Sequence, residues 1–213
     1  MRLALCVIPC LFLTGFGLAQ TGGTTGPKRP PAECPQEIDV LSDKSLATVS
    51  LPPAKKCKAK KKNGLPVPDP ACTPGALNET LTLEVMEKSN FKTECVRDRA
   101  ETGEKKEVTY TWYKIKKPAD NTHQNQVCEL DHLVSLELGG ADTLDNIWPQ
   151  CGPSKVILNA RFFKRKDAVE NFLAAEVRHG KITLAEAQKG IAEDWTQFLK
   201  DAEACPKDDC SNP

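Results

Sequence analysis

The residues whose types and spacing could support chemistry lie in one segment, residues 128–151, with the sequence CELDHLVSLELGGADTLDNIWPQC. Asp131 and His132 are adjacent, Asn146 follows after a Gly-Gly turn, and a cysteine stands at each end. A carboxylate is a suitable ligand for a hard cation such as Mg²⁺, and a histidine can remove a proton near neutral pH. The segment therefore predicts a divalent metal site beside a general base.

Such a pair suits phosphodiester hydrolysis, which needs a deprotonated water and neutralisation of the charge that builds on the phosphate. In a regular strand, Asp131 and His132 point to opposite faces, so we expect a bulge or bend that brings both to one phosphate. A purely structural histidine is the alternative. His132 is favoured as functional because it follows an acid, faces Asn146 and precedes a basic segment. By contrast, His123 lies in a polar loop and His179 suits a helix C-terminus.

Two strands, a glycine turn and a following helix must position these residues. The pattern predicts an antiparallel hairpin over 128–151, and apolar spacing predicts one long or two shorter helices over 154–178. A capping box beginning at Thr183 predicts a last helix that reaches Leu199. The second strand of the hairpin carries Asn146, which can hold backbone or imidazole groups in place without adding charge.

The chain upstream of the hairpin is poorer in regular structure. Residues 64–78 are rich in Pro and Gly and predict a loop, and residues 79–90 predict a short helix. The β-branched and aromatic residues 108–113 predict a strand, and residues 34–54 fit a strand or a short helix laid on the domain. The expected fold class is α+β.

The first residues have the features of a secretory signal peptide. Arg2 precedes a short apolar run, and small residues lead to a cleavage site between Ala19 and Gln20. The apolar run is too short for a stable membrane anchor. We therefore expect a secreted or periplasmic protein that makes no membrane contact after cleavage.

Two of the ten cysteines fall in this leader, which leaves eight. An even number in an exported chain favours disulfides, and the alternative of a structural zinc site lacks the usual C-x-x-C spacing. The ends of an antiparallel hairpin meet, so we expect Cys128 to pair with Cys151. Cys72 with Cys95 is the second expected pair, and the last two cysteines are candidates to close a small loop.

Charge alone does not indicate a nucleic-acid partner, because 29 basic and 29 acidic residues give a net charge of zero. The distribution is uneven, however. Lysines crowd residues 55–62, and further basic residues crowd 155–166. The first cluster is interpreted as a solvated loop, with an electrostatic arm for phosphates as the alternative.

Several motifs in order carry a resemblance to a known family. Asp131-His132-Leu133-Val134, then Leu138-Gly139-Gly140, then Asn146-Ile147-Trp148-Pro149 resemble the ββα-metal core of HNH endonucleases, especially secreted bacterial HNH-like proteins. Asn159-Ala160 and Lys166-Asp167-Ala168-Val169-Glu170-Asn171 are similar to later motifs of that group, as are residues 69–76 and 184–195. The resemblance covers roughly residues 66–200 and implies an HNH (His-Me finger) core with N-terminal disulfide-tied loops and C-terminal helices.

The resemblance also implies roles for individual residues. His132 matches the general base, Asp131 a metal-ligating carboxylate, and Asn146 the catalytic-site residue that steadies the hairpin and orients the base. Asn159 is the candidate second metal ligand, with Asp167 as the alternative. The metal implied is Mg²⁺, with Mn²⁺ or another transition metal as alternatives.

The substrate-binding candidates are basic residues around the expected helix, Lys155, Arg161 and Lys166. For Lys166, and for Glu170 on the same helix, a structural salt link is the alternative. The implied function is a secreted, metal-dependent endonuclease that cuts DNA, or RNA, with little sequence specificity. The alternative is a disulfide-rich binding module that keeps the scaffold without turnover. We expect a monomer whose partner is nucleic acid, and an inhibitor protein is a further candidate partner.

The chain thus divides into four expected parts. They are a signal peptide at 1–19, a flexible lysine-rich region at 20–63, an HNH-like nuclease domain at 64–202 and a polar tail at 203–213.

Overall fold

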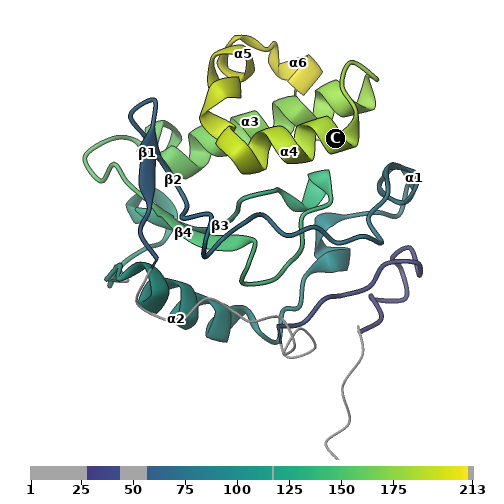
Figure 1. Cartoon of the computed structure of the whole chain (residues 1–213), viewed down its shortest axis with the longest axis horizontal. Helices are drawn as coiled ribbons and strands as arrows, with labels where there is room; N and C mark the ends of the chain where they lie inside the picture. The colour runs from purple at the N-terminus through teal and green to yellow at the C-terminus, as the bar shows by residue number, and fades with distance from the viewer. Residues whose placement is uncertain (1–27, 44–56, 117, 211–213) are drawn as a thin grey trace, which may run out of the picture.

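The computed structural model describes residues 28–43, 57–116 and 118–210, so the expected signal peptide lies outside the described residues. The fold is mixed α+β, with two small antiparallel sheets and several helices (Figure 1). The strands are β1 (Lys60–Lys62), β2 (Leu65–Val67), β3 (Cys128–His132) and β4 (Ile147–Cys151). The α-helices are α1 (Leu83–Met86), α2 (Thr102–Tyr113), α3 (Phe162–Arg178), α4 (Leu184–Asp194), α5 (Leu199–Ala204) and α6 (Lys207–Cys210). Short 3₁₀ turns are η1 (Thr93–Val96), η2 (His123–Asn125), η3 (Leu136–Leu138), η4 (Leu158–Ala160) and η5 (Trp195–Phe198).

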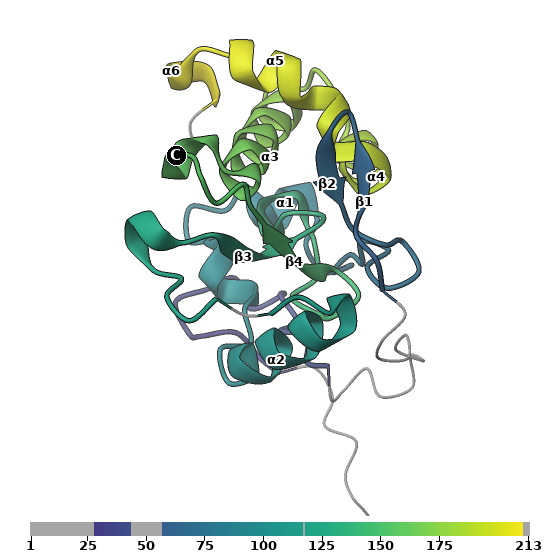
Figure 2. The same cartoon turned by 90° about the vertical axis from the view of Figure 1, so that its left-hand side faces the viewer.

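The β3–β4 hairpin lies at the centre of the molecule. Its strands pair from Cys128 opposite Cys151 to His132 opposite Ile147, which confirms the hairpin expected from the sequence. α2 packs against one side of the hairpin and α3 against the other, with α4 and α5 beside α3 (Figures 1 and 2). The hairpin is therefore held between two helical layers.

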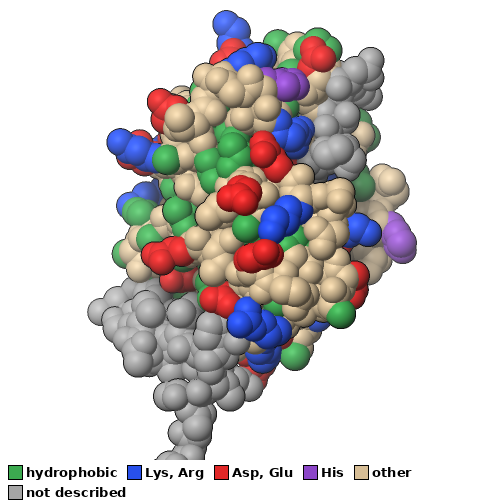
Figure 3. Space-filling model, turned by 90° about the vertical axis from the view of Figure 1, so that its right-hand side faces the viewer, with side chains coloured by type: hydrophobic (Ala, Val, Ile, Leu, Met, Phe, Trp, Pro, Cys, Tyr) green, Lys and Arg blue, Asp and Glu red, His purple; other side chains and the backbone are tan. Residues whose placement is uncertain are grey.

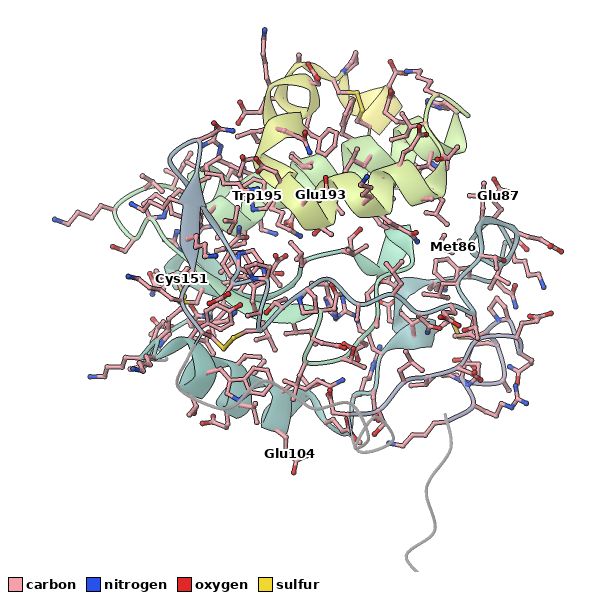
Figure 4. All side chains as sticks on the ribbon, in the orientation of Figure 1. Met86, Glu87, Glu104, Cys151, Glu193 and Trp195 are labelled. Atoms are coloured by element: carbon pink, nitrogen blue, oxygen red, sulfur yellow. A yellow bond between two sulfur atoms is a disulfide. The ribbon has the colours of Figure 1, made fainter. Side chains whose placement is uncertain are left out.

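The C-terminal helices form a layer with its own apolar core. The predicted capping box is present, because Thr183 and Glu186 exchange side-chain and backbone hydrogen bonds at the start of α4. Trp195, labelled in Figure 4, is fully buried and donates its Nε1 hydrogen to the carbonyl of Pro66 in β2, at 3.1 Å. Within the described ranges, no helix is long and apolar enough to cross a membrane.

The strand expected at 108–113 is wrong, because these residues form the second half of α2. Tyr110, Trp112 and Tyr113 are buried there, and the Tyr113 ring lies 6.3 Å from that of Trp148 in β4. Aromatic and β-branched residues favour strands by packing on a pleated surface, but the same side chains can bury themselves from one side of a helix. Packing of these side chains against the β3–β4 hairpin stabilises residues 108–113 as a helix. The helix expected at 79–90 is also shorter, since α1 covers only four residues.

The lysine-rich stretch is partly ordered. β1 and β2 are joined by Asn63 and Gly64, which both have positive φ, as a tight two-residue hairpin turn requires. The domain boundary expected at residue 64 therefore falls inside a hairpin, and the folded unit begins earlier. Lys60, Lys61 and Lys62 are exposed on β1, whereas the first lysines of the stretch, Lys55 and Lys56, lie outside the described residues.

Four disulfides are present, which confirms disulfides over a zinc site for these cysteines. Cys128 pairs with Cys151 at the end of the hairpin, as expected, and Cys205 pairs with Cys210. The expected Cys72–Cys95 pair is wrong. Instead, Cys57 pairs with Cys72 and Cys34 pairs with Cys95. The reason is that the N-terminal segment packs on η1, which places Cys34 beside Cys95 in a small apolar cluster with Ile38.

Candidate active site

Asn146 fixes the shape of the chain around the end of β3. Its side chain is fully buried, accepts a hydrogen bond from the Val134 N–H (2.9 Å) and donates to the carbonyls of Val134 (2.9 Å) and Ala141 (2.8 Å). Gly140 makes this closure possible, because a Cβ there would lie 1.9 Å from the Val134 carbonyl oxygen. The Asn146 side chain therefore holds backbone groups of the turn, and these hydrogen bonds do not reach the His132 ring that it was expected to orient.

His132 is held by a residue that the sequence reasoning did not single out. Its Nε2 lies 2.8 Å from Oδ1 of Asp142, in the loop between the strands. Burial opposes ionisation of Asp142, but its hydrogen bond with His132 and the charge of Lys105 outweigh this and hold its pKa below the ordinary value. An ionised carboxylate can only accept, so Nε2 carries the proton and Nδ1 carries the lone pair.

The imidazole of His132 is suited to act as a base. Burial lowers its pKa below the ordinary value, with a further contribution from the positive charge of Arg97, while Asp142 works in the opposite direction. The ring is therefore neutral near pH 7. A neutral histidine oriented by a carboxylate through one nitrogen can accept a proton at the other.

Asp131 points away from His132 and into an interior ion-pair network. Lys166, on α3, is fully buried and places its ammonium 3.1 Å from Asp131 Oδ2 and 2.7 Å from the His132 carbonyl oxygen. The same ammonium also bonds Glu170, and Trp148 donates its Nε1 hydrogen to Asp131 at 2.9 Å. Although burial disfavours its charge, Lys166 has a pKa raised above the ordinary value by Asp131 and Glu170. The salt-link alternative for Lys166 and Glu170 is confirmed.

A narrow, acidic cavity of about 300 Å³ follows the free edge of β3, between η1, η3 and α3. Its carboxylates come from β3, η3 and α3, namely Glu129, Asp131, Glu137, Asp167 and Glu170. Burial raises the pKa of Glu129 to about 7, with the negative charges of Asp167 and Asp131 adding to the shift. This side of the hairpin disfavours a phosphate unless cations accompany it.

A second cavity of about 550 Å³ lies on the other side of His132, between α2 and β3, and we call it the α2 cavity. It is lined by basic side chains, Arg97, Lys105 and Lys106, as well as by Asp142 and Tyr110. His132, Glu129, Leu130 and Arg97 line both cavities. The histidine therefore lies at the junction of a cationic cavity and an acidic one.

The largest cavity lies elsewhere. It measures about 860 Å³ and runs between α1, η1 and the beginning of α4, lined in part by Met86 and Phe91. Figure 3 views the molecule from the α1 side, and basic and acidic side chains are interspersed on that face. This face therefore has no continuous patch of positive charge, and a phosphate bound there would be recognised by individual side chains.

The other predicted site residues do not converge on Asp131. Asn159 lies on η4 with an exposed side chain, outside the described lining of the acidic cavity. Lys155 is exposed, whereas Arg161 is buried and donates to the carbonyl of Gln124 at 2.9 Å. Lys166 is enclosed by its carboxylate partners and Arg161 is buried, so the structure does not present either as the exposed phosphate contact that the sequence suggested.

The described residues also do not form the expected metal site in this arrangement. Among them, no group of three or more His, Cys, Asp or Glu side chains is placed to hold a metal ion. The carboxylate of Asp131, the expected ligand, is already neutralised by Lys166. The metal therefore stays a prediction.

The residues around His132 that the sequence did not indicate are Asp142, Lys105 and Arg97. Asp142 follows the Gly-Gly turn and is one of several acids in that segment, so its sequence position did not distinguish it. Lys105 lies in the first half of α2, before the residues 108–113 for which a strand was predicted, and its buried ammonium bonds the carbonyl oxygen of Asp142. No protein-family model, curated protein or solved structure matches this chain, so the likeness to HNH endonucleases rests on the sequence motifs alone.

Proposed function

We propose that this protein is an HNH-type endonuclease that hydrolyses phosphodiester bonds in DNA or RNA. The observation that supports this most is the His132–Asp142 pair at the junction of the two cavities. A neutral histidine, oriented by an ionised carboxylate and beside a cationic cavity, can act as the general base in hydrolysis of a phosphate ester.

In this proposal, Nδ1 of His132 takes a proton from a water molecule as the water oxygen attacks phosphorus. The new P–O bond forms as the P–O bond to the leaving sugar oxygen breaks, and the leaving oxygen takes a proton from solvent. Asp142 stabilises the imidazolium that forms and keeps the ring in one orientation. Asn146 keeps the turn that carries both residues in place.

The proposal keeps a divalent cation, Mg²⁺ or Mn²⁺, as a predicted requirement. A hard cation would neutralise charge on the phosphate, and Asp131 is the carboxylate that the sequence motif assigns to it. In the structure Asp131 is paired with Lys166, so a cation at Asp131 would have to compete with this ion pair.

The same proposal places the protein outside the cell or in the periplasm. Four disulfides are typical of proteins that fold in an oxidising compartment. The signal-peptide features of residues 1–19 agree with export.

Cleavage assays on the oxidised protein test the function. We expect it to nick plasmid DNA, or to cut RNA, in the presence of Mg²⁺ or Mn²⁺, and to lose activity in EDTA if the metal prediction holds. His132→Ala should lower the rate by a factor on the order of 10²–10⁴, the usual contribution of a general base. His179→Ala, at an exposed position at the end of α3, is the matched control and should cut like the parent.

Two results would refute the proposal. One is the absence of cleavage under every metal condition, and the other is a His132→Ala protein that cuts as fast as the parent. The pairing of Asp131 with Lys166 favours one alternative, a binding module without turnover. That alternative predicts salt-sensitive nucleic-acid binding that EDTA does not change and no cleavage.

A further inference from the structure

Arg97 is a candidate for the phosphate contact beside His132, for which Lys155, Arg161 and Lys166 are not suitably placed. It follows η1 directly, its side chain is exposed, and it lines both the α2 cavity and the acidic cavity. Among the described residues, its guanidinium makes no ion pair with a carboxylate. A guanidinium of this kind can donate two parallel hydrogen bonds to a phosphate.

The other cations near His132 are already committed. The Lys105 ammonium is 3% exposed and lies 3.2 Å from Asp142 Oδ2. Lys166 is fully buried against Asp131 and Glu170. Among the described basic residues, Lys106 is the one other exposed side chain that lines a cavity containing His132.

The backbone around Arg97 is anchored on both sides. Two residues before it, Cys95 is bonded to Cys34. Directly after it, the Asp98 N–H donates to Oδ2 of Asp142 at 2.7 Å, the carboxylate whose other oxygen binds His132. The chain that carries Arg97 is therefore tied to the same residue that orients the base.

Charge selects the path of a polyanion past His132. The acidic cavity is lined by carboxylates of β3, η3 and α3, whereas the α2 cavity adds the exposed Lys106 to Arg97, which lines both cavities. The carboxylates repel a nucleic-acid backbone, and Arg97 and Lys106 attract it. Its lowest-energy course follows the α2 cavity and reaches the acidic side only at the histidine.

We propose that Arg97 binds the scissile phosphate beside His132, and that Lys106 binds an adjacent phosphate of the same strand in the α2 cavity. This assignment rests on the proposed function and gives the site its substrate contact, in place of Lys155, Arg161 and Lys166. Contacts to phosphates alone confer affinity without sequence choice. The site therefore accepts a nucleic-acid strand largely independently of its sequence.

Binding measurements test this inference separately from catalysis. In the His132→Ala background, fluorescence anisotropy with labelled single-stranded and double-stranded oligonucleotides gives the affinity as a function of salt. Arg97→Ala should weaken binding and reduce the slope of log K against log salt by about 0.7–0.9, the loss of one phosphate contact. Arg99→Ala is the matched control, since Arg99 is exposed and two residues away but does not line either cavity.

Cleavage by the active protein supplies the second readout. Arg97→Ala should lower kcat/KM by a factor on the order of 10², Arg97→Lys should recover part of it, and Arg99→Ala should leave it unchanged. Near-UV circular dichroism and the thermal midpoint show whether each variant is folded.

The outcomes separate the two proposals. If the parent does not cut, the proposed function fails, and the anisotropy arm still decides whether Arg97 binds the strand. If the parent cuts, the inference is overturned when a folded Arg97→Ala protein binds and cuts like the parent. It is also overturned when Arg99→Ala loses as much as Arg97→Ala.

Discussion

Replacement of Lys166 by Met tests the interior ion pairs that join α3 to the hairpin. Lys166 is fully buried and is the cation for two carboxylates, Asp131 with 6% of its side chain exposed and Glu170 with 16%. Methionine keeps most of the volume and removes the charge. The two carboxylates are then left in the interior without a counter-ion, although Asp131 keeps its hydrogen bond from Trp148. A buried charge without a counter-ion is more costly than the loss of an ion pair in water.

The expected loss is large relative to the stability of a domain. Removal of one partner from a buried ion pair costs about 3–5 kcal/mol, whereas the whole domain is expected to be stable by about 5–15 kcal/mol. Lys189→Ala is the control, because Lys189 and Glu193 form an exposed pair on α4 at 3.9 Å. An exposed helical pair of this spacing contributes only about 0.3–0.5 kcal/mol.

Urea denaturation of the oxidised proteins measures both variants. The Lys166→Met midpoint should fall strongly at an unchanged slope, and the Lys189→Ala midpoint should hardly move. Adding Asp131→Asn to Lys166→Met should recover at least about 1 kcal/mol, because one of the two orphaned charges is gone. A Lys166→Met loss below about 1 kcal/mol, or a double variant no more stable than the single one, would refute this account of the network.

Four further predictions follow from the same structure. Asn146→Ala leaves three buried backbone groups without a partner and should cost at least about 3 kcal/mol in urea denaturation. Gly140→Ala places a Cβ within 1.9 Å of a backbone oxygen and should abolish soluble, folded protein in expression trials. Replacing Cys128 and Cys151 by Ser opens a loop with a sequence separation of 23 and should cost about 3 kcal/mol by the same measurement. Burial raises the pKa of Asp43 to about 6, so the folded state binds this proton more tightly than the unfolded chain. Stability should therefore fall as the pH rises from about 4 to 6, and Asp43→Asn should flatten that part of the pH–stability curve.

The local features of this fold could be predicted from the sequence. The hairpin was visible because an alternating apolar segment, a Gly-Gly turn and two cysteines all required the same pairing. The capping box at Thr183 was visible because it depends on residues three positions apart. Features of this kind depend on residues within one turn or one hairpin, so side-chain type and spacing are enough to predict them.

The parts that failed depend on contacts between distant segments. Residues 108–113 have strand propensities, yet Trp112 and Tyr113 are buried as part of a helix, in one apolar cluster with Trp148. Eight cysteines allow about 105 pairings, and only the packing of the N-terminal segment on η1 selects Cys34 for Cys95. Asp142 lies in the same hairpin as His132 but is one of several acids there, whereas Arg97 comes to line the same cavities as His132 only through the packing of distant segments. Neither residue therefore stands out in a linear pattern.

The disulfides also determine how the chain responds to a protease. The Cys57–Cys72 ring lies inside the ring closed by Cys34 and Cys95, and the Cys128–Cys151 ring stands apart. One cut anywhere between residues 34 and 95, or between 128 and 151, leaves both fragments covalently joined. The stretch from 96 to 127, which contains α2, is spanned by no disulfide among those described. After a single cut there, no described disulfide joins the two fragments, so they can separate without reduction. A cut within α2 would therefore disrupt the α2 cavity.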